Sequence, residues 1–248
     1  MLIIAGSGRS GTSAVAKLLH LSGVSVGRDL IDPDESNADG YFEERAVVEV
    51  NDAILRSAGL VEWFTTATRA RIIDAARPHA EAMRVLVAEA TPAWKDPRFS
   101  WTLEAWLPLF REPPRLVVCL RSPDEVAAST LRYYGADGAE PRQAVRHVWR
   151  AQYERLLDVI DDYRLDATCI EYAAMHGAAG EDEVRRLAAF VGRELDASGV
   201  RRALRHHQAP VDAGLAGLYE RVRTLAARTP APEPPAGAAP GASAPSPT

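Results

Sequence analysis

The sequence predicts an α/β protein, a three-layer sandwich in which a central parallel sheet is flanked by helices. The chain opens on a short apolar run, residues 2–5, which passes through a glycine-serine loop into a helical pattern. A second apolar run, 116–120, also leads directly into a helix start. Strands that alternate with helices in this way favour a parallel sheet that is covered on both faces.

The elements follow from the spacing of apolar residues. After the first strand and helix, residues 27–40 are polar and rich in Asp, Pro, Asn and Gly, so they predict an exposed loop. Residues 122–125, Ser-Pro-Asp-Glu, form a helix start with a capping serine, proline at the first position and glutamate at the third. The predicted strands are 2–5, 94–96, 116–120 and 168–172. The predicted helices are 12–21, 41–57, 69–88, 99–110, a helix from 123, 141–162, 181–192, 197–206 and 211–227.

Length and composition limit the class of protein. A chain of 248 residues is long enough for one domain with a sizeable core. Its net charge of −5 gives no support for binding nucleic acid or a membrane surface. Residues 229–248 hold seven of the 17 prolines, mixed with alanine, glycine and serine, and predict a disordered tail. We therefore expect a folded domain over 1–228 and a tail over 229–248.

We expect a cytoplasmic location without membrane insertion. The N-terminus has no basic segment followed by an apolar stretch and a cleavage site. No window reaches the ~18 uninterrupted apolar residues of a membrane-spanning helix. Cys119 and Cys169 both lie in apolar, strand-like runs, so they are predicted to be small core residues in a reducing compartment.

The first loop is P-loop-like. Gly6-x4-Gly11-Thr12-Ser13 nearly fits the pattern G-x4-G-K-[ST], in which loop N–H groups and a helix N-terminus hold phosphate. Thr12 stands where the pattern requires lysine, and the cation lies upstream at Arg9. Without that lysine an ATPase or kinase lacks its main contact to the outer phosphates. The loop therefore predicts an anionic ligand of a different kind.

Residues 8–13, Gly-Arg-Ser-Gly-Thr-Ser, resemble the 5′-phosphosulfate loop of sulfotransferases that use 3′-phosphoadenosine 5′-phosphosulfate (PAPS). Arg121, after the second apolar strand, and Ser129, eight residues later, resemble the 3′-phosphate site of the same family. The resemblance implies a sulfotransferase domain over 1–228, with PAPS as the sulfuryl donor. It assigns PAPS binding to Ser7, Gly8, Arg9, Ser10, Gly11, Thr12, Ser13, Arg121 and Ser129.

Three residues are predicted to take part in the chemistry. Arg9 is placed to oppose the charge that grows on the oxygen between phosphate and sulfur. Lys95 belongs to a Lys-Asp-Pro-Arg run, 95–98, which resembles a run in bacterial sulfotransferases and either brings positive charge to the sulfate or forms a structural salt-bridge corner. Glu43 is the first candidate for the general base that accepts the acceptor's proton. Glu44, Glu35 and His147 remain alternatives for that base.

Two further groups of residues are left open. The late basic cluster either contacts the 3′-phosphate and adenine or forms a solvated helix face; it comprises Arg201, Arg202, Arg205, His206 and His207. The tryptophans either line an acceptor pocket or belong to the core; they are Trp63, Trp94, Trp101, Trp106 and Trp149.

These predictions define a sulfotransferase of secondary metabolism that transfers a sulfuryl group by in-line displacement. The expected acceptor is a hydroxyl, or as a second choice an amine, of a small molecule, sugar or lipid-linked compound. We expect no metal, because arginine and lysine provide the positive charge, and the sequence leaves a homodimer open. The alternatives are a P-loop nucleotide kinase, which would need ATP and magnesium, and a non-catalytic protein that binds PAPS or another nucleotide.

Overall fold

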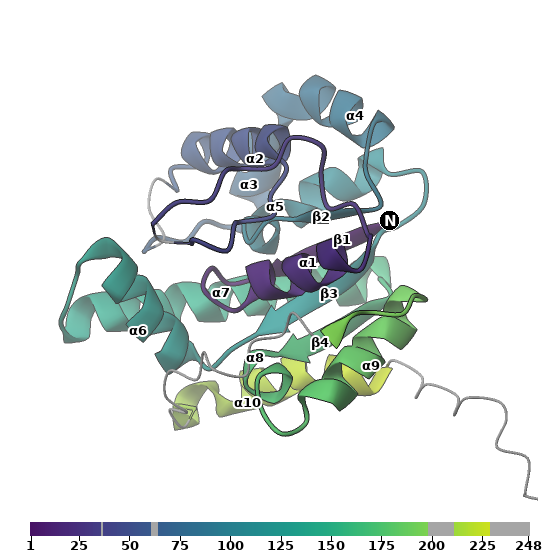
Figure 1. Ribbon diagram of the computed structural model, residues 1–248. Helices are drawn as coiled ribbons and strands as arrows, with labels where there is room; N and C mark the ends of the chain where they lie inside the picture. The colour runs from purple at the N-terminus through teal and green to yellow at the C-terminus, as the bar shows by residue number, and fades with distance from the viewer. Residues whose placement is uncertain (36, 61–63, 198–210, 229–248) are drawn as a thin grey trace, which may run out of the picture.

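A computed structural model describes residues 1–35, 37–60, 64–197 and 211–228 of the chain (Figure 1). Within these ranges the strands form one sheet in the order β2-β1-β3-β4, and every pair in it is parallel. The predicted α/β architecture with a central parallel sheet is therefore confirmed. The strands are β1 (Leu2–Gly6), β2 (Ala93–Lys95), β3 (Arg115–Leu120) and β4 (Ala167–Glu171).

Helices cover both faces of this sheet, because successive side chains of each strand point to opposite sides. Leu2 and Ile4 pack with one group of helices, whereas Ile3 and Ala5 pack with the other. Figure 1 shows α1 in front of the strands and α7 behind them. The first group comprises α1 (Thr12–Leu21), α8 (Tyr172–Met175) and α9 (Gly180–Val191). The second group comprises α2 (Arg45–Ser57), α3 (Arg69–Ala76), α4 (Ala80–Ala88), α5 (Phe99–Trp106), α6 (Pro123–Tyr134), α7 (Ala139–Tyr163) and α10 (Ala213–Arg223).

Three predicted boundaries were wrong. The helix predicted over 41–57 begins at Arg45, because Phe42 takes a left-handed backbone (φ 57°) that a helix cannot contain. The helix predicted over 69–88 is divided into α3 and α4 by the 3₁₀ turn Arg77–His79, since Pro78 lacks a backbone N–H. The strand predicted over 168–172 ends one residue earlier, where α8 starts.

The remaining elements are short or close to their predicted bounds. Two more 3₁₀ turns, Leu107–Leu109 and Thr224–Arg228, extend α5 and α10. The helix predicted over 197–206 and the tail predicted over 229–248 fall outside the described residues, apart from position 197. No helix in the described ranges is long and apolar enough to cross a membrane.

The order of the strands determines where a ligand site can form. The chain passes from β1 to β2 on one side, and then crosses to β3 on the other side of β1. In an open parallel sheet such a reversal leaves a crevice outside the carboxyl ends of the strands, where ligands bind. The loop after β1, Lys95 at the end of β2 and Arg121 after β3 all belong to this edge.

Candidate functional site

The loop between β1 and α1 has the geometry of an anion-binding turn. Gly11 adopts φ 96°, and a Cβ atom there would lie 2.5 Å from Cδ2 of Tyr172, so only glycine fits. Arg9 also has a left-handed backbone, with φ 66°. Gly11 caps α1 without a side-chain hydrogen bond, so no capping side chain satisfies the first N–H groups of the helix. These groups and the helix dipole favour a negative ligand at this point.

Lys95 supplies, from another strand, the positive charge that the loop lacks at Thr12. Its Nζ atom donates to Ser13 Oγ at 3.1 Å and to the backbone oxygen of Tyr41 at 3.1 Å. The third contact is an ion pair with Glu43 Oε1. The Lys95 side chain is 1% exposed, so all three ammonium donors are used inside the protein. The ammonium group is thereby fixed against the first turn of α1.

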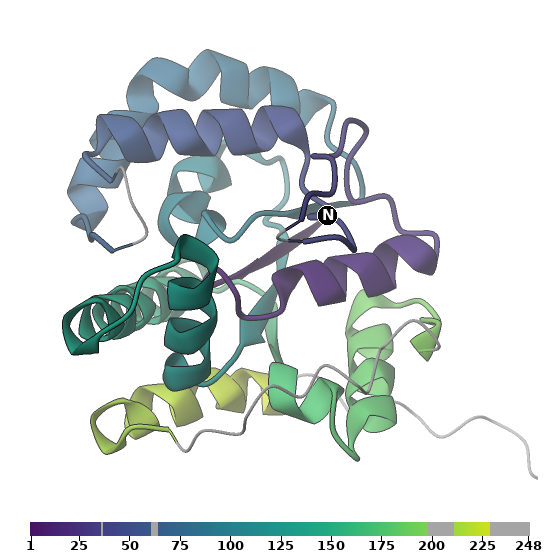
Figure 2. The same cartoon turned by 60° about the vertical axis from the view of Figure 1, so that its left-hand side comes forward.

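A second group of cationic side chains lies on the other side of the loop, where Figure 2 shows α6 beside the start of α1. Arg9 Nε donates to Ser129 Oγ at 3.1 Å. Arg121 Nη1 donates to the backbone oxygen of Arg9 at 3.3 Å, and its Nε pairs with Glu125 Oε2 at 2.8 Å. The Arg121 guanidinium lies over the ring of Tyr172, 4.3 Å from its centroid. The structure thus joins Arg9, Arg121 and Ser129, as the motif spacing predicts for the last two.

Both groups line one cavity of about 370 Å³. All the residues predicted to bind PAPS line it except Ser10, which is buried beneath the loop. Lys95 and Glu43 line the same cavity. The structure therefore brings the predicted binding and catalytic residues together, although they come from separate parts of the chain.

The candidate bases occupy different positions. Glu43 is buried in the cavity wall, where its Oε2 lies 3.5 Å from Arg98 Nη1. Glu44 turns away and accepts backbone N–H groups of Arg28 and Asp29. Glu35 and His147 are exposed and do not line the cavity. Of the four alternatives, only Glu43 has the position that a base for a bound acceptor requires.

The environment of Glu43 raises the pKa of its carboxyl above the ordinary value. Burial is the largest cause, because removal from water disfavours the charged form. The charges of Lys95 and Arg98 act in the opposite direction, and Asp96 acts in the same direction as burial. Glu43 is therefore a stronger base than its two ion pairs alone would allow.

Several residues of the site were missed or left open by the sequence. Tyr172 directly follows β4, as Arg121 follows β3, and this position was the available signal for its role at the loop. Trp94, Trp101, Trp106 and Trp149 are buried, and none of them lines the cavity. The late basic cluster and Trp63 lie outside the described residues.

The chain is thus an α/β protein in which two groups of cationic side chains line one cavity. Among solved structures, the chain is similar to the sulfotransferase domain of the olefin synthase of Synechococcus PCC 7002, with a TM-score of 0.51 and 14% identity over 89% of this chain and 93% of that one. A sulfotransferase domain from the curacin biosynthetic pathway also matches, with a TM-score of 0.47 and 15% identity over 94% and 92% of the two chains. The first likeness shows that this chain has the sulfotransferase fold. No family model and no curated protein matches the sequence.

Proposed function

We propose that this protein is a sulfotransferase that moves the sulfuryl group of PAPS to a hydroxyl group. The observation that carries the proposal is the presence of two separate sets of anion-binding groups in one cavity. The first set is the loop at the start of α1 with Lys95, and the second is Arg9, Arg121 and Ser129. A nucleotide with phosphate at both the 5′ and 3′ positions matches two such sets, whereas ATP carries its phosphates in a single row.

Each set has a distinct role in this proposal. The loop N–H groups bind the 5′-phosphosulfate end, and together with the positive charge of Lys95 they oppose the charge that develops there. Arg121 and Ser129 bind the 3′-phosphate. The sequence suggested that Arg9 serves the phosphosulfate end, but its hydrogen bond to Ser129 favours a role at the 3′-phosphate. We therefore assign Arg9 to the 3′-phosphate and leave Lys95 as the main cation at the sulfur.

The donor supplies a sulfuryl group that is already activated by its bond to phosphate. The residues of the chain then have to align the acceptor, remove its proton and stabilise the leaving oxygen. Glu43 accepts the proton of the acceptor hydroxyl as the new sulfur–oxygen bond forms. The sulfur–oxygen bond to the 5′-phosphate breaks at the same centre, and adenosine 3′,5′-bisphosphate leaves with the negative charge that Lys95 and the loop N–H groups oppose.

The cavity also bears on the class of acceptor. Aromatic and aliphatic side chains form part of its wall, and two of its tyrosines, Tyr133 and Tyr134, are exposed. Such a wall favours an acceptor with an apolar body over an unsubstituted sugar. Further apolar residues that line the cavity are Ala14, Leu18, Phe42, Pro97, Val145, Val148 and Met175.

The arrangement gives less support to a nucleotide kinase. A kinase needs a carboxylate that is available for magnesium, and Asp96 directly follows β2 at the edge of the sheet where the site lies. Both oxygens of Asp96 are engaged, by Asn51 Nδ2 at 2.8 Å and by Arg98 Nη1 at 3.0 Å. Within the described residues, no group of three or more histidine, cysteine, aspartate or glutamate side chains is arranged to hold a metal ion.

Calorimetric titration of the purified protein tests the proposal. Adenosine 3′,5′-bisphosphate is compared with ATP in the presence of magnesium. Binding of the bisphosphate at micromolar concentration, without binding of ATP, is the expected result. Binding of ATP alone would reject the proposal in favour of a kinase. Release of the bisphosphate from PAPS in an acceptor screen then separates an enzyme from a protein that only binds the nucleotide.

Replacement of Arg9 by alanine is expected to weaken the binding of adenosine 3′,5′-bisphosphate about fivefold to twentyfold, because one charge-assisted hydrogen bond is lost. The binding of adenosine 5′-phosphate should change much less. Calorimetry with both nucleotides measures the difference. Equal losses for the two nucleotides would instead place Arg9 at the 5′ end.

Replacement of Glu43 by glutamine is expected to lower turnover about 100-fold or more while PAPS affinity changes little, since general base catalysis contributes on this scale. The base acts in its ionised form, and the pKa of Glu43 is raised. Turnover of the wild type should therefore fall as the pH decreases through that raised pKa, and this limb should be absent in the variant. Release of adenosine 3′,5′-bisphosphate with the acceptor found in the screen is the measurement. Unchanged turnover would exclude Glu43 as the base.

A further inference from the structure

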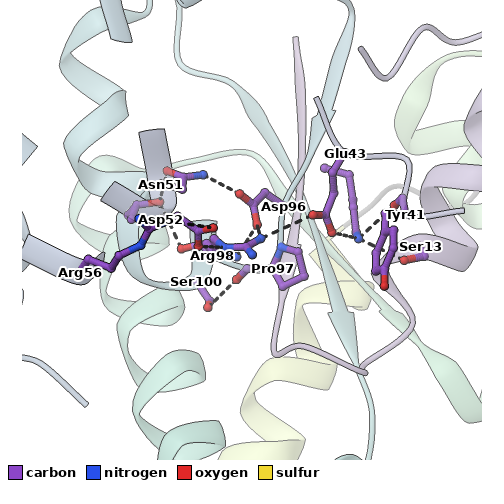
Figure 3. Close-up of polar contacts among 12 residues, drawn as sticks. Ser13, Tyr41, Glu43, Asn51, Asp52, Arg56, Asp96, Pro97, Arg98 and Ser100 are labelled. Atoms are coloured by element: carbon purple, nitrogen blue, oxygen red, sulfur yellow. Dashed lines mark hydrogen bonds and ion pairs between the residues drawn. The ribbon is translucent and has the colours of Figure 1, made fainter. Parts of the chain in front are cut away.

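Arg98 connects Glu43 to two aspartates, Asp96 of the predicted 95–98 run and Asp52, which the sequence did not link to the site. It lies between β2 and α5, and its side chain is 16% exposed. Its Nε pairs with Asp52 Oδ1 at 2.5 Å, and its Nη1 pairs with Asp96 Oδ1 at 3.0 Å. The same Nη1 lies 3.5 Å from Glu43 Oε2 (Figure 3). One guanidinium thus contacts three carboxylates.

Asp96 is held in place by several hydrogen bonds, and its contacts to Arg98 fix the position of that side chain as well. The Asp96 side chain is fully buried, and its Oδ1 also accepts the backbone N–H of Arg98 at 2.9 Å. Its Oδ2 accepts from Asn51 Nδ2 at 2.8 Å. Asn51 Oδ1 in turn accepts from Thr102 Oγ1 at 2.8 Å and from Trp106 Nε1 at 2.9 Å. This chain of buried hydrogen bonds fixes Asp96, and through it Arg98, against α2 and α5.

The cations and carboxylates of this cluster are joined in one network. Three cations, Lys95, Arg98 and the exposed Arg56, contact three carboxylates, Glu43, Asp52 and Asp96, so the cluster carries 3 − 3 = 0. Without the aspartates, Lys95 and Arg98 would make Glu43 a weak base, because an adjacent opposite charge favours the ionised carboxylate. Asp52 and Asp96 offset the charge of Arg98, and Asp96 holds the same Nη1 atom that lies 3.5 Å from Glu43 Oε2.

We propose that Arg98 is a positioning residue for Glu43, and that Asp52 and Asp96 neutralise its charge so that Glu43 remains basic enough to take the proton of the acceptor. The charged groups of the cluster are Lys95 on β2, Asp96 and Arg98 before α5, and Asp52 and Arg56 on α2, where the exposed Arg56 lies 3.8 Å from Asp52 Oδ2. The neighbouring Glu44 faces Arg28 and Asp29. The proposal rests on the proposed function in one respect, the role of Glu43 as the base.

The test is a pH titration of the Glu43 carboxyl by ¹³C NMR, on the full chain labelled at the glutamate carboxyl carbons and without any nucleotide. The Glu43 signal is assigned by its loss in Glu43→Gln. Arg98→Gln removes a positive charge beside the carboxyl and should raise its pKa by about one unit. Asp52→Asn keeps an oxygen that accepts from Arg98 Nε but removes the negative charge. It should lower the pKa of Glu43 by about half a unit, a smaller change because Asp52 acts through Arg98.

Shifts of opposite sign in the pKa of Glu43 distinguish an effect of charge from a loss of structure. A loss of structure would change this pKa in the same direction in both variants. Asp162→Asn is the matched control, because Asp162 shares Arg69 with the buried Glu104 in a similar ion-pair arrangement. It should leave the titration of Glu43 unchanged. A shift of the same sign in Arg98→Gln and Asp52→Asn, or no shift in Asp52→Asn, would overturn the proposal. Asp52 is 34% exposed, so we expect Asp52→Asn to fold. If Arg98→Gln does not fold, the pKa shift in Asp52→Asn alone tests the proposal.

The titration is independent of the proposed function, because it uses neither donor nor acceptor. If the bisphosphate does not bind but the two opposite shifts are observed, the charge cluster is confirmed and the sulfotransferase proposal fails. If the bisphosphate binds and the pKa shifts are absent, the proposed nucleotide site is supported and Arg98 has a purely structural role.

Discussion

Replacement of Lys95 by methionine is expected to lower the free energy of unfolding by about 3–5 kcal/mol, because it leaves Glu43 buried without its nearest cation. The two side chains are 1% and 6% exposed, so water cannot replace the missing ammonium group. Ser13 and the backbone oxygen of Tyr41 also lose a donor. Urea unfolding at pH 8, followed by circular dichroism, measures the change.

A second variant shows whether the cost comes from the unpaired charge. The double replacement Lys95→Met and Glu43→Gln removes both charges, so most of the lost stability should return. The chain offers a matched control in its only other lysine, Lys17, which forms an ion pair with Asp39 and is 23% exposed. Lys17→Met should cost less than about 1 kcal/mol. A double variant that is no more stable than Lys95→Met would show that packing, and not the charge of Glu43, determines the loss.

Replacement of Arg121 by alanine is expected to weaken the binding of adenosine 3′,5′-bisphosphate by about 1.5–3 kcal/mol, the range for a charge-assisted contact. Adenosine 5′-phosphate, which lacks the 3′-phosphate, should lose much less. The loss for the bisphosphate is enlarged because Glu125, 8% exposed, then keeps its charge without Arg121 Nε. Calorimetric titration with both nucleotides gives the two affinities.

The control for this experiment is Arg132→Ala, which removes an exposed arginine from α6, the helix that follows Arg121. It should leave both affinities unchanged within a factor of about two. Equal losses for both nucleotides in Arg121→Ala would remove Arg121 from the 3′-phosphate site. A loss for the bisphosphate in Arg132→Ala as large as in Arg121→Ala would attribute the effect to the overall positive charge of the arginines around the site.

The β1 loop and the Arg121–Ser129 pair could be predicted because each is a local pattern. A strand, a glycine loop and a helix follow one another within residues 2–21, and their form depends on backbone conformations that only nearby residues set. Arg121 and Ser129 lie at the end of β3 and on α6, eight positions apart. The helix start predicted at residue 41 was wrong, because here the local pattern and the backbone conformation disagree. The apolar spacing continues through residues 41–44, whereas the backbone turns at Phe42 and brings Glu43 to Lys95.

The sequence by itself therefore determined the α/β class, the parallel sheet and the two motifs that line the cavity. Only the tertiary structure decided which charges meet. Lys95 reaches Ser13 and Glu43 because β2 pairs with β1 in the register Ile4↔Lys95, and Arg9 meets Ser129 across 120 positions of the chain. Arg98 joins Asp52 to Asp96 through the packing of α2 against α5. Electrostatic effects at a site depend on distances between such remote groups and on their burial, and neither quantity is written in the local pattern of the chain.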